Sequence, residues 1–142
     1  MATQRLTISV VLSAKPLEVY KAWLSAREHG LFTGAKATIT ARVGSRFSAG
    51  DGYISGKTLE VEPGRRIVQS WRTTEFSETD PDSRLEILVA PAKGGTRLTL
   101  KHAALPPGTA AKYRDGWREF YFEPMRAYFA ALAGRRCSCG RK

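Results

Sequence analysis

Apolar and polar residues alternate near the start of the chain, where Leu6, Ile8, Val10 and Leu12 are each separated by one residue. Such alternation places the apolar side chains on one face of a half-buried strand. We therefore predict a strand over residues 4–12. A secretory signal would instead be continuously apolar behind a basic start, so we do not expect one here.

The next segment changes to helical spacing. Pro16 suits the first turn of a helix, where the amide proton that it lacks would have no partner, and Glu18 lies near the positive end of the helix dipole. Apolar residues cover most sides of this segment, which predicts a short buried helix. Gly30 and Gly34 punctuate the following residues, where the pattern allows a second short helix around Phe32.

Over residues 35–102 the pattern predicts only strands and turns. Glycine-containing turns at residues 50–52, 62–64 and 93–95 mark hairpins. We expect six strands: around Ile39, around Phe47, and over residues 53–61, 67–72, 85–89 and 96–102. Consecutive hairpins predict an antiparallel sheet with one buried face and one wet face.

A long amphipathic helix follows. Thr109 can cap its N-terminus, and we expect it to run to about Ala133, with Gly134 as its stop. Pro124 removes a backbone donor inside it, so we expect a bend there. An apolar stripe at helical spacing contains Tyr113, Trp117, Phe120, Tyr121, Met125, Tyr128, Phe129 and Leu132. The sheet offers the only large apolar face that could bury it.

Several short segments, in this order and spacing, resemble one known family. They are PLEVYKAW at 16–23, VGSRF at 43–47, GYISG at 52–56, IVQSW at 67–71, GTRLTLKH at 95–102 and GW at 116–117. The chain resembles the activator-of-heat-shock-protein-90-ATPase-like branch of the START-like (SRPBCC) superfamily over residues 5–132. It departs from the family pattern at Phe32, where relatives usually have tryptophan, and at Ser45, where a second glycine is usual.

This resemblance implies an α+β helix-grip fold of the START/Bet v 1-like kind. In that fold a curved antiparallel sheet wraps around a long C-terminal helix, two short helices follow the first strand, and a deep apolar cavity remains. The superfamily includes carriers of lipids, sterols and polyketide-like molecules, some cyclases, and co-chaperone domains.

The length of 142 residues suits one domain, which we place at residues 1–134. Residues 135–142 contain four of the basic residues behind the net charge of +10, and we expect a disordered basic tail there. Its two cysteines, Cys137 and Cys139, are too few for a closed zinc site. No nucleic-acid motif accompanies the charge, and no apolar run approaches the ~20 residues of a membrane span. We expect a cytoplasmic protein without a cofactor or metal, and leave the oligomeric state open.

Candidate site residues come from the faces that the sheet and long helix would turn toward each other. The expected walls are Phe47, Trp71, Trp117, Tyr121 and Met125, with Tyr53 and His102 as hydrogen-bonding groups that orient a ligand. Tyrosine and tryptophan suit such walls because each has an apolar body and one polar tip. The alternative for each aromatic residue is an ordinary place in the core.

We also predict where the histidines and the acidic residues lie. His102 shares a face with Leu98 and should point inward, either toward a ligand or to a neighbour that satisfies it. His29, near a glycine turn, is expected on the surface. Glu75 and the acids that follow it, Glu78, Asp80 and Asp82, are expected in a solvated hairpin loop.

Three functions remain open. The first is binding of a small hydrophobic molecule, lipid, sterol-like or polyketide-like, between the sheet and the C-terminal helix. The alternative is a co-chaperone-like module acting on a heat-shock-protein-90-type ATPase, which predicts a filled interior and an exposed patch. The third is a cyclase or hydrolase with polar groups inside the cavity, although the sequence contains no recognisable catalytic motif.

Overall fold

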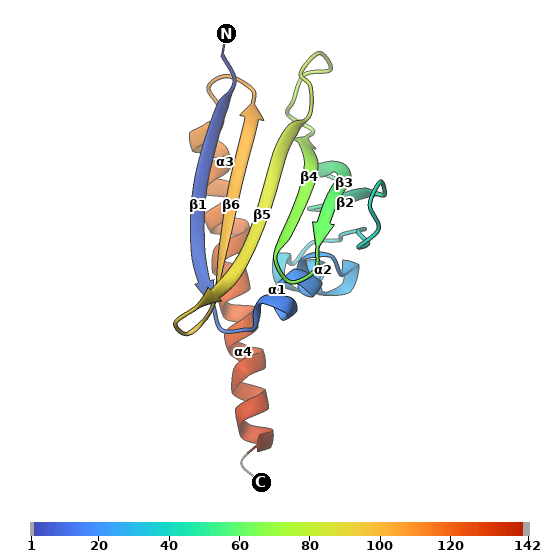
Figure 1. The fold of residues 1–142 in the computed structure, drawn as a ribbon. Coiled ribbons are helices and arrows are strands. Elements are labelled where there is room, and N and C mark those ends of the chain that lie inside the picture. Colours follow the sequence, from blue (N-terminus) through green and yellow to red (C-terminus); the bar gives the residue numbers. More distant parts are fainter. Residues whose placement is uncertain (1, 141–142) are drawn as a thin grey trace.

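The computed structural model describes residues 2–140, and side chains as far as residue 134 (Figure 1). The elements are β1 (Gln4–Leu12), α1 (Pro16–Trp23), α2 (Ala26–Thr33), β2 (Arg46–Ala49), β3 (Ile54–Glu62), β4 (Arg66–Thr73), β5 (Ser83–Ala92), β6 (Gly95–Leu105), α3 (Ala110–Trp117), the π-helical turn η1 (Arg118–Phe122) and α4 (Glu123–Gly140). The two short helices predicted after the first strand are present as α1 and α2.

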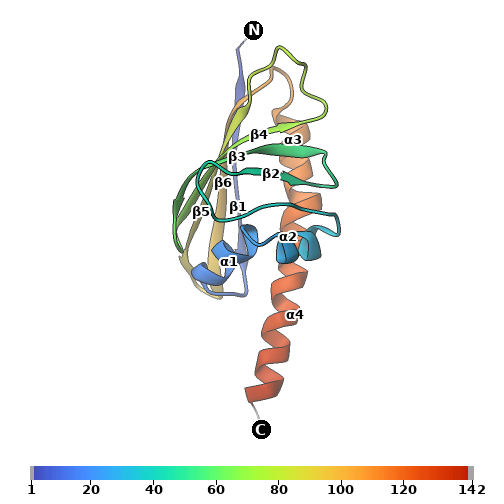
Figure 2. The ribbon, with the colours of Figure 1, turned by 90° about the vertical axis from the view of Figure 1, so that its right-hand side faces the viewer.

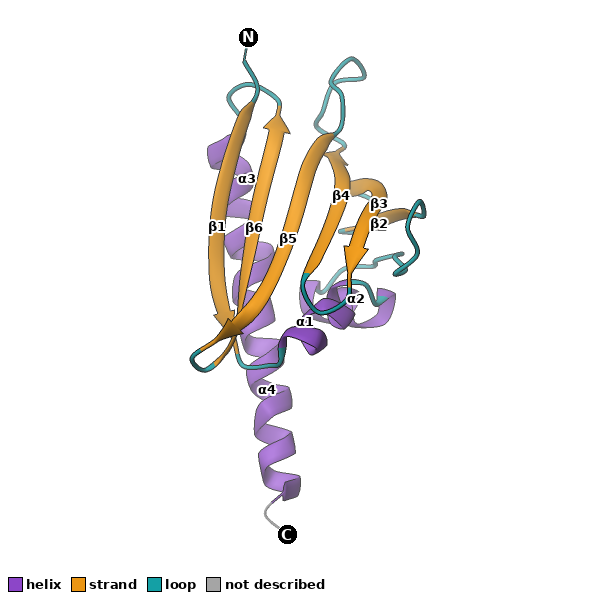
Figure 3. Cartoon of the chain, in the orientation of Figure 1, coloured by secondary structure: helices purple, strands orange, loops and turns teal. Residues whose placement is uncertain are grey.

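One antiparallel sheet holds all six described strands, in the order β1-β6-β5-β4-β3-β2. Figure 2 shows α3, η1 and α4 as a continuous rod, which begins along one face of this sheet and extends past the sheet in the later part of α4. Figure 3 shows the same division into a strand layer and a helix layer. The predicted α+β architecture, a curved sheet against one long C-terminal helix, is confirmed.

The strand expected around Ile39 is absent, so five strands rather than six follow the short helices. Thr38 and Ser48 form a single isolated bridge, in which each backbone amide donates to the other carbonyl at 2.9 Å. Beyond Ile39 the pairing stops, because the chain turns toward β3, where the amide of Gly44 donates to the carbonyl of Thr58. Ile39 is nevertheless buried, so its apolar character reflects packing rather than a strand.

The predicted inward faces of β1 and β6 meet in the sheet. Leu6 lies opposite His102, and Ile8 lies opposite Leu100. Leu100 is fully buried, and burying such a side chain stabilises a fold by about 1.5–3 kcal/mol. The alternation in the sequence therefore sets the strand register, since a slip by one residue would turn this whole face to solvent.

We predicted a bend at Pro124, and the structure has a π-helical turn just before it, at Arg118–Phe122. The bend itself stays a prediction. The amide of Glu123 donates to the carbonyl of Arg118, five residues back instead of four. Such a widened turn accommodates a residue that cannot donate to the normal α-helical ladder. It also adds an extra residue to the turn that carries Tyr121, next to Trp117.

The long helix does not stop at Gly134 as predicted, and α4 continues to Gly140. A glycine inside a helix costs only about 1 kcal/mol relative to alanine, which does not by itself end a helix. The side chains of residues 135–140 lie outside the described part, as do residues 141–142, so the expected basic tail with Cys137 and Cys139 stays a prediction. No helix in the described residues is long and apolar enough to cross a membrane.

Candidate ligand-binding cleft

A cleft of about 500 Å³ opens to solvent between the long helix and the sheet. It lies against α3 and the π-helical turn on one side, and against the beginning of β3 and the end of β4 on the other, with the end of α2 at its edge. Six aromatic residues line it: Tyr53, Trp71, Tyr113, Trp117, Phe120 and Tyr121. A volume of this size falls within the range of ordinary small-molecule sites.

Residues at helical spacing on the long helix form one wall of the cleft. Tyr113, Trp117 and Tyr121 follow each other at intervals of four residues, and Phe120, which is 61% exposed, extends this wall toward the solvent. Gly116 lies among them, and a Cβ atom added there would meet nothing within 4 Å. The missing side chain keeps this part of the cleft open.

Edge-on ring contacts hold the walls in place. The Trp71 ring lies 5.2 Å from that of Tyr113 at an interplanar angle of 87°, and Trp117 lies 4.8 Å from Tyr121 at 67°. This geometry is the favourable one for aromatic pairs, because the positive edge of one ring meets the negative face of the other. The walls are therefore packed against each other as well as against the core.

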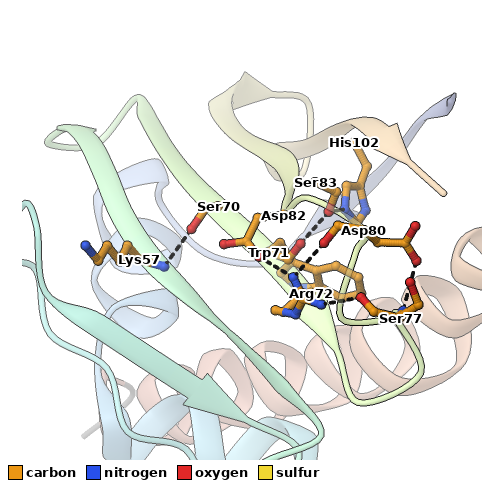
Figure 4. Close-up of polar contacts among 9 residues, drawn as sticks. All are labelled: Lys57, Ser70, Trp71, Arg72, Ser77, Asp80, Asp82, Ser83 and His102. Carbon is orange, nitrogen blue, oxygen red and sulfur yellow. Dashed lines mark hydrogen bonds and ion pairs between the residues drawn. The ribbon is translucent and has the colours of Figure 1, made fainter.

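His102 lies behind the cleft rather than in its lining. Its Nδ1 accepts a hydrogen bond of 3.1 Å from the indole of Trp117, so its proton is on Nε2, which donates to the hydroxyl of Ser83 at 2.8 Å. That hydroxyl in turn donates to the carbonyl of Trp71, and Figure 4 shows Ser83 between His102 and Trp71. Burial lowers the pKa of His102 to about 3. His102 therefore joins both tryptophan walls through neutral hydrogen bonds.

The expectation that His29 lies on the surface is wrong, because only 2% of it is exposed. Its Nδ1 donates to the carbonyl of Trp23 at 2.8 Å, which leaves Nε2 to accept from the hydroxyl of Tyr121 at 2.7 Å. Helix α2 turns this ring inward, where it stacks near Phe32. Burial lowers the pKa of His29 to about 4 and raises the pKa of Tyr121.

Charged groups occur only at the mouth of the described cleft, where Glu75 and Lys112 form an ion pair. The hydroxyl of Tyr53 donates to Glu75 at 2.7 Å, and the Lys112 Nζ lies 5.2 Å from the centre of the Tyr113 ring. Deeper in, the hydroxyls of Thr73 and Tyr113 bond to each other at 2.8 Å. The hydroxyls of Thr73 and Tyr113 are therefore satisfied within the protein.

The acidic loop after β4 is otherwise a solvated turn. Arg72 bonds the carboxylate of Asp82 at 2.8 Å and the carbonyl of Asp80 at 3.0 Å, and the Asp80 carboxylate accepts from the amide of Ser77 (Figure 4). These contacts hold the loop in one shape. Of the acids expected there, Glu75 is the one that reaches the cleft.

The structure brings four of the seven predicted site residues together in the cleft lining: Tyr53, Trp71, Trp117 and Tyr121. Phe47 and Met125 are buried in the core away from the lining, as is His102. Whether any of the seven contacts a ligand stays a prediction. Sequence reasoning placed Tyr113 and Phe120 on the apolar helix stripe without assigning them to the site, and nothing local to Lys112 marked it.

Among the described residues, no group of three or more histidine, cysteine, aspartate or glutamate side chains is arranged to hold a metal ion. Likewise, no buried side-chain nitrogen or oxygen lacks a hydrogen-bond partner within the described part. What the cleft offers is therefore an aromatic surface with one charged pair at its rim.

Comparison with known proteins adds a second line of evidence. Residues 13–130 match the family model described as Activator of Hsp90 ATPase homolog 1-like protein. A curated relative from Homo sapiens, Activator of 90 kDa heat shock protein ATPase homolog 1, is 27% identical over 127 residues, which are 89% of this chain. The chain spans 37% of that relative's length.

Solved structures agree on the fold. An Hsp90 activator from Plasmodium falciparum superposes with a TM-score of 0.82 at 21% identity, covering 91% of this chain and 97% of that one. CalU16 from Micromonospora echinospora gives a TM-score of 0.68 at 27% identity, covering 82% and 68%. The helix-grip fold is thus confirmed, and the chain belongs to the Activator of Hsp90 ATPase homolog 1-like family.

Proposed function

We propose that this protein binds a small, mostly apolar molecule in the cleft between its sheet and its C-terminal helix. The observation that carries the proposal is the lining itself, in which six aromatic side chains surround about 500 Å³ that remains unfilled. Sites of this kind bind through apolar contact and use a few polar groups to orient the ligand. Lipid, sterol-like and aromatic polyketide-like molecules all have this character.

Gly116 supports the same conclusion. Glycine inside a helix is less stable than alanine by about 1 kcal/mol, and no neighbouring atom excludes a side chain at this position. A larger residue would project into the cleft. The cleft is therefore open at a position where alanine would make the helix more stable than glycine does.

Binding is better supported than catalysis. A cyclase or hydrolase needs titratable groups that face the substrate. His29 and His102 use both ring nitrogens in internal hydrogen bonds, and burial keeps the pKa of each well below neutral. Glu75 and Lys112 lie at the rim and are paired with each other.

The test is occupancy of the cleft. Native mass spectrometry of the protein purified from its own host should detect a bound small molecule. Gly116→Leu should abolish that species, because its side chain would occupy the cleft. Gly134→Leu is the matched control, since a Cβ at Gly134 also meets nothing within 4 Å and lies outside the lining. An unchanged bound species in Gly116→Leu would overturn the proposal.

A second candidate is action on a heat-shock-protein-90-type ATPase, as the names of the curated relatives suggest. Arg97 and Lys101 stand exposed on the outer face of β6, and no described acid forms an ion pair with either. These two positive charges suit an acidic protein surface, although Glu86 lies opposite Lys101 on β5. The expected cytoplasmic location also stays a prediction.

An ATPase assay with the chaperone from the same source tests this candidate. Added protein should stimulate ATP hydrolysis, and the double variant R97E/K101E should lower that stimulation without changing occupancy of the cleft. No stimulation by the wild-type chain would exclude it.

A further inference from the structure

The carboxylate of Glu75 is held in position at the mouth of the cleft. One of its oxygens accepts the 2.7 Å hydrogen bond from the Tyr53 hydroxyl, and its backbone amide donates to Oγ1 of Thr73 at 3.1 Å. Tyr53 itself lines the cleft. The carboxylate of Glu75 is therefore oriented by Tyr53, which directly precedes β3, and its backbone is held by Thr73 at the end of β4, both independently of the long helix.

The ammonium group of Lys112 occupies the space next to this carboxylate. It forms the ion pair with Glu75 and lies 5.2 Å from the centre of the Tyr113 ring. A carboxylate combined with the face of an aromatic ring is a typical environment for an organic cation. In the structure, the side chain of Lys112 thus occupies this cation site.

We propose that the cleft takes an apolar organic cation, such as an aromatic or alkyl amine, whose charged nitrogen replaces the ammonium of Lys112 beside Glu75. This inference rests on the proposed function and assigns a chemical class to its ligand. The apolar part of the ligand lies against Trp71 and Trp117, and its cationic end points to the mouth.

Replacement of the Lys112 ammonium by a cationic ligand breaks fewer contacts than replacement of the Glu75 carboxylate by an anionic ligand. Lys112 is 47% exposed at its side chain and can return to water, and exposed ion pairs contribute little to stability. The bond from Tyr53 to Glu75 then remains intact. An anionic ligand would have to displace Glu75, which breaks the contacts of that carboxylate with both Tyr53 and Lys112.

The aromatic lining favours the same sign of charge. The faces of aromatic rings carry negative electrostatic potential and attract cations. Six aromatic side chains surround the ligand space, and Lys112 is the only cationic residue in the lining of the described cleft. Once Lys112 has moved aside, the site presents one negative charge and several electron-rich ring faces.

Three naphthalene compounds of matched shape test the proposal by isothermal titration calorimetry: 2-naphthylmethylammonium, 2-naphthylmethanol and 2-naphthoate. We expect the cation to bind about tenfold more tightly than the neutral alcohol, and the anion to bind most weakly. Lys112→Met should strengthen cation binding several-fold and leave alcohol binding unchanged, because Glu75 loses its internal partner. Glu75→Gln should remove the preference for the cation.

Lys101→Met is the matched control, since it removes the same charge from the outer face of β6. It should leave the order of the three affinities unchanged. Melting temperatures check that every variant is folded, and Glu75 and Lys112 are both exposed enough for substitution without loss of core packing.

The outcomes separate the two proposals. Binding of the alcohol at least as tight as that of the cation, or a cation preference that survives Glu75→Gln, would overturn the charge inference and leave the apolar cleft intact. Tightest binding of the naphthoate would overturn it in the same way. Failure of all three compounds to bind the wild-type protein would count against the proposed function itself.

Discussion

The hydroxyl of Tyr121 donates a 2.7 Å hydrogen bond to Nε2 of His29, which joins the π-helical turn to helix α2. The other ring nitrogen of His29 donates to the carbonyl of Trp23, so the imidazole bridges both short-helix segments and the long helix. The contact fixes the ring of Tyr121, which forms part of the cleft wall. The position of that wall therefore depends on a buried hydrogen bond as well as on apolar packing.

Removal of this hydroxyl should destabilise the protein. Tyr121→Phe leaves Nε2 of His29 buried without a donor, and we expect a loss of about 1–3 kcal/mol in the free energy of unfolding, measured by urea denaturation. Tyr20→Phe is the control, because burial alone, with no hydrogen bond, raises the pKa of its hydroxyl, and the substitution should change stability little. Equal effects of the two substitutions would contradict this account.

The two buried histidines should make the protein acid-sensitive. Folding lowers the pKa of His29 to about 4 and that of His102 to about 3, both from the ordinary value of 6.5. The unfolded chain therefore binds more protons below pH 6.5, and stability is lost as the pH falls through that value toward the folded pKa. Each histidine should cost about 2 kcal/mol at pH 5 relative to pH 8.

Urea denaturation across pH 5 to 8 measures this loss. His29→Gln should remove about half of the histidine-dependent slope, because one of the two titrating groups is then gone. A free energy of unfolding that does not change between pH 8 and pH 5 would show that the histidines are not buried as neutral groups.

Two glycines should respond to alanine in opposite directions. Gly116→Ala should stabilise the protein by about 0.5–1 kcal/mol, since the methyl group meets open space and alanine favours the helix. Gly56→Ala should destabilise it by about 3 kcal/mol, because its Cβ would lie 1.8 Å from the carbonyl oxygen of Ser70 on the neighbouring strand. Thermal unfolding of both variants provides the comparison.

His102 should influence the cleft without lining it. His102→Leu leaves the indole N–H of Trp117 without an acceptor, and the hydroxyl of Ser83 keeps only its bond to the carbonyl of Trp71. We expect about tenfold weaker binding of 2-naphthylmethanol because the tryptophan wall loses its support. His102→Asn keeps an acceptor for Trp117 and should retain more of the affinity. Equal affinity in His102→Leu and the wild type, measured by calorimetry, would remove His102 from this positioning role.

Much of the fold could be predicted because its signals are local. The alternation around Leu6 and Ile8 is a property of neighbouring residues, and it was sufficient to place them on one buried strand face. Only the structure shows that they lie opposite His102 and Leu100. The spacing of Trp117 and Tyr121 likewise predicted one helical face. A short apolar stretch is less informative, which is why Ile39 suggested a strand although only one bridge forms there.

The sequence by itself determined which faces of the strands and of the long helix are buried, because backbone periodicity and hydrophobicity act over a few residues. Only the tertiary structure decided that His29 bonds Tyr121 and that Lys112 meets Glu75. Those partners are far apart along the chain, and no local preference links them. They come together because the sheet and the long helix pack at one fixed spacing, which also leaves the aromatic cleft between them.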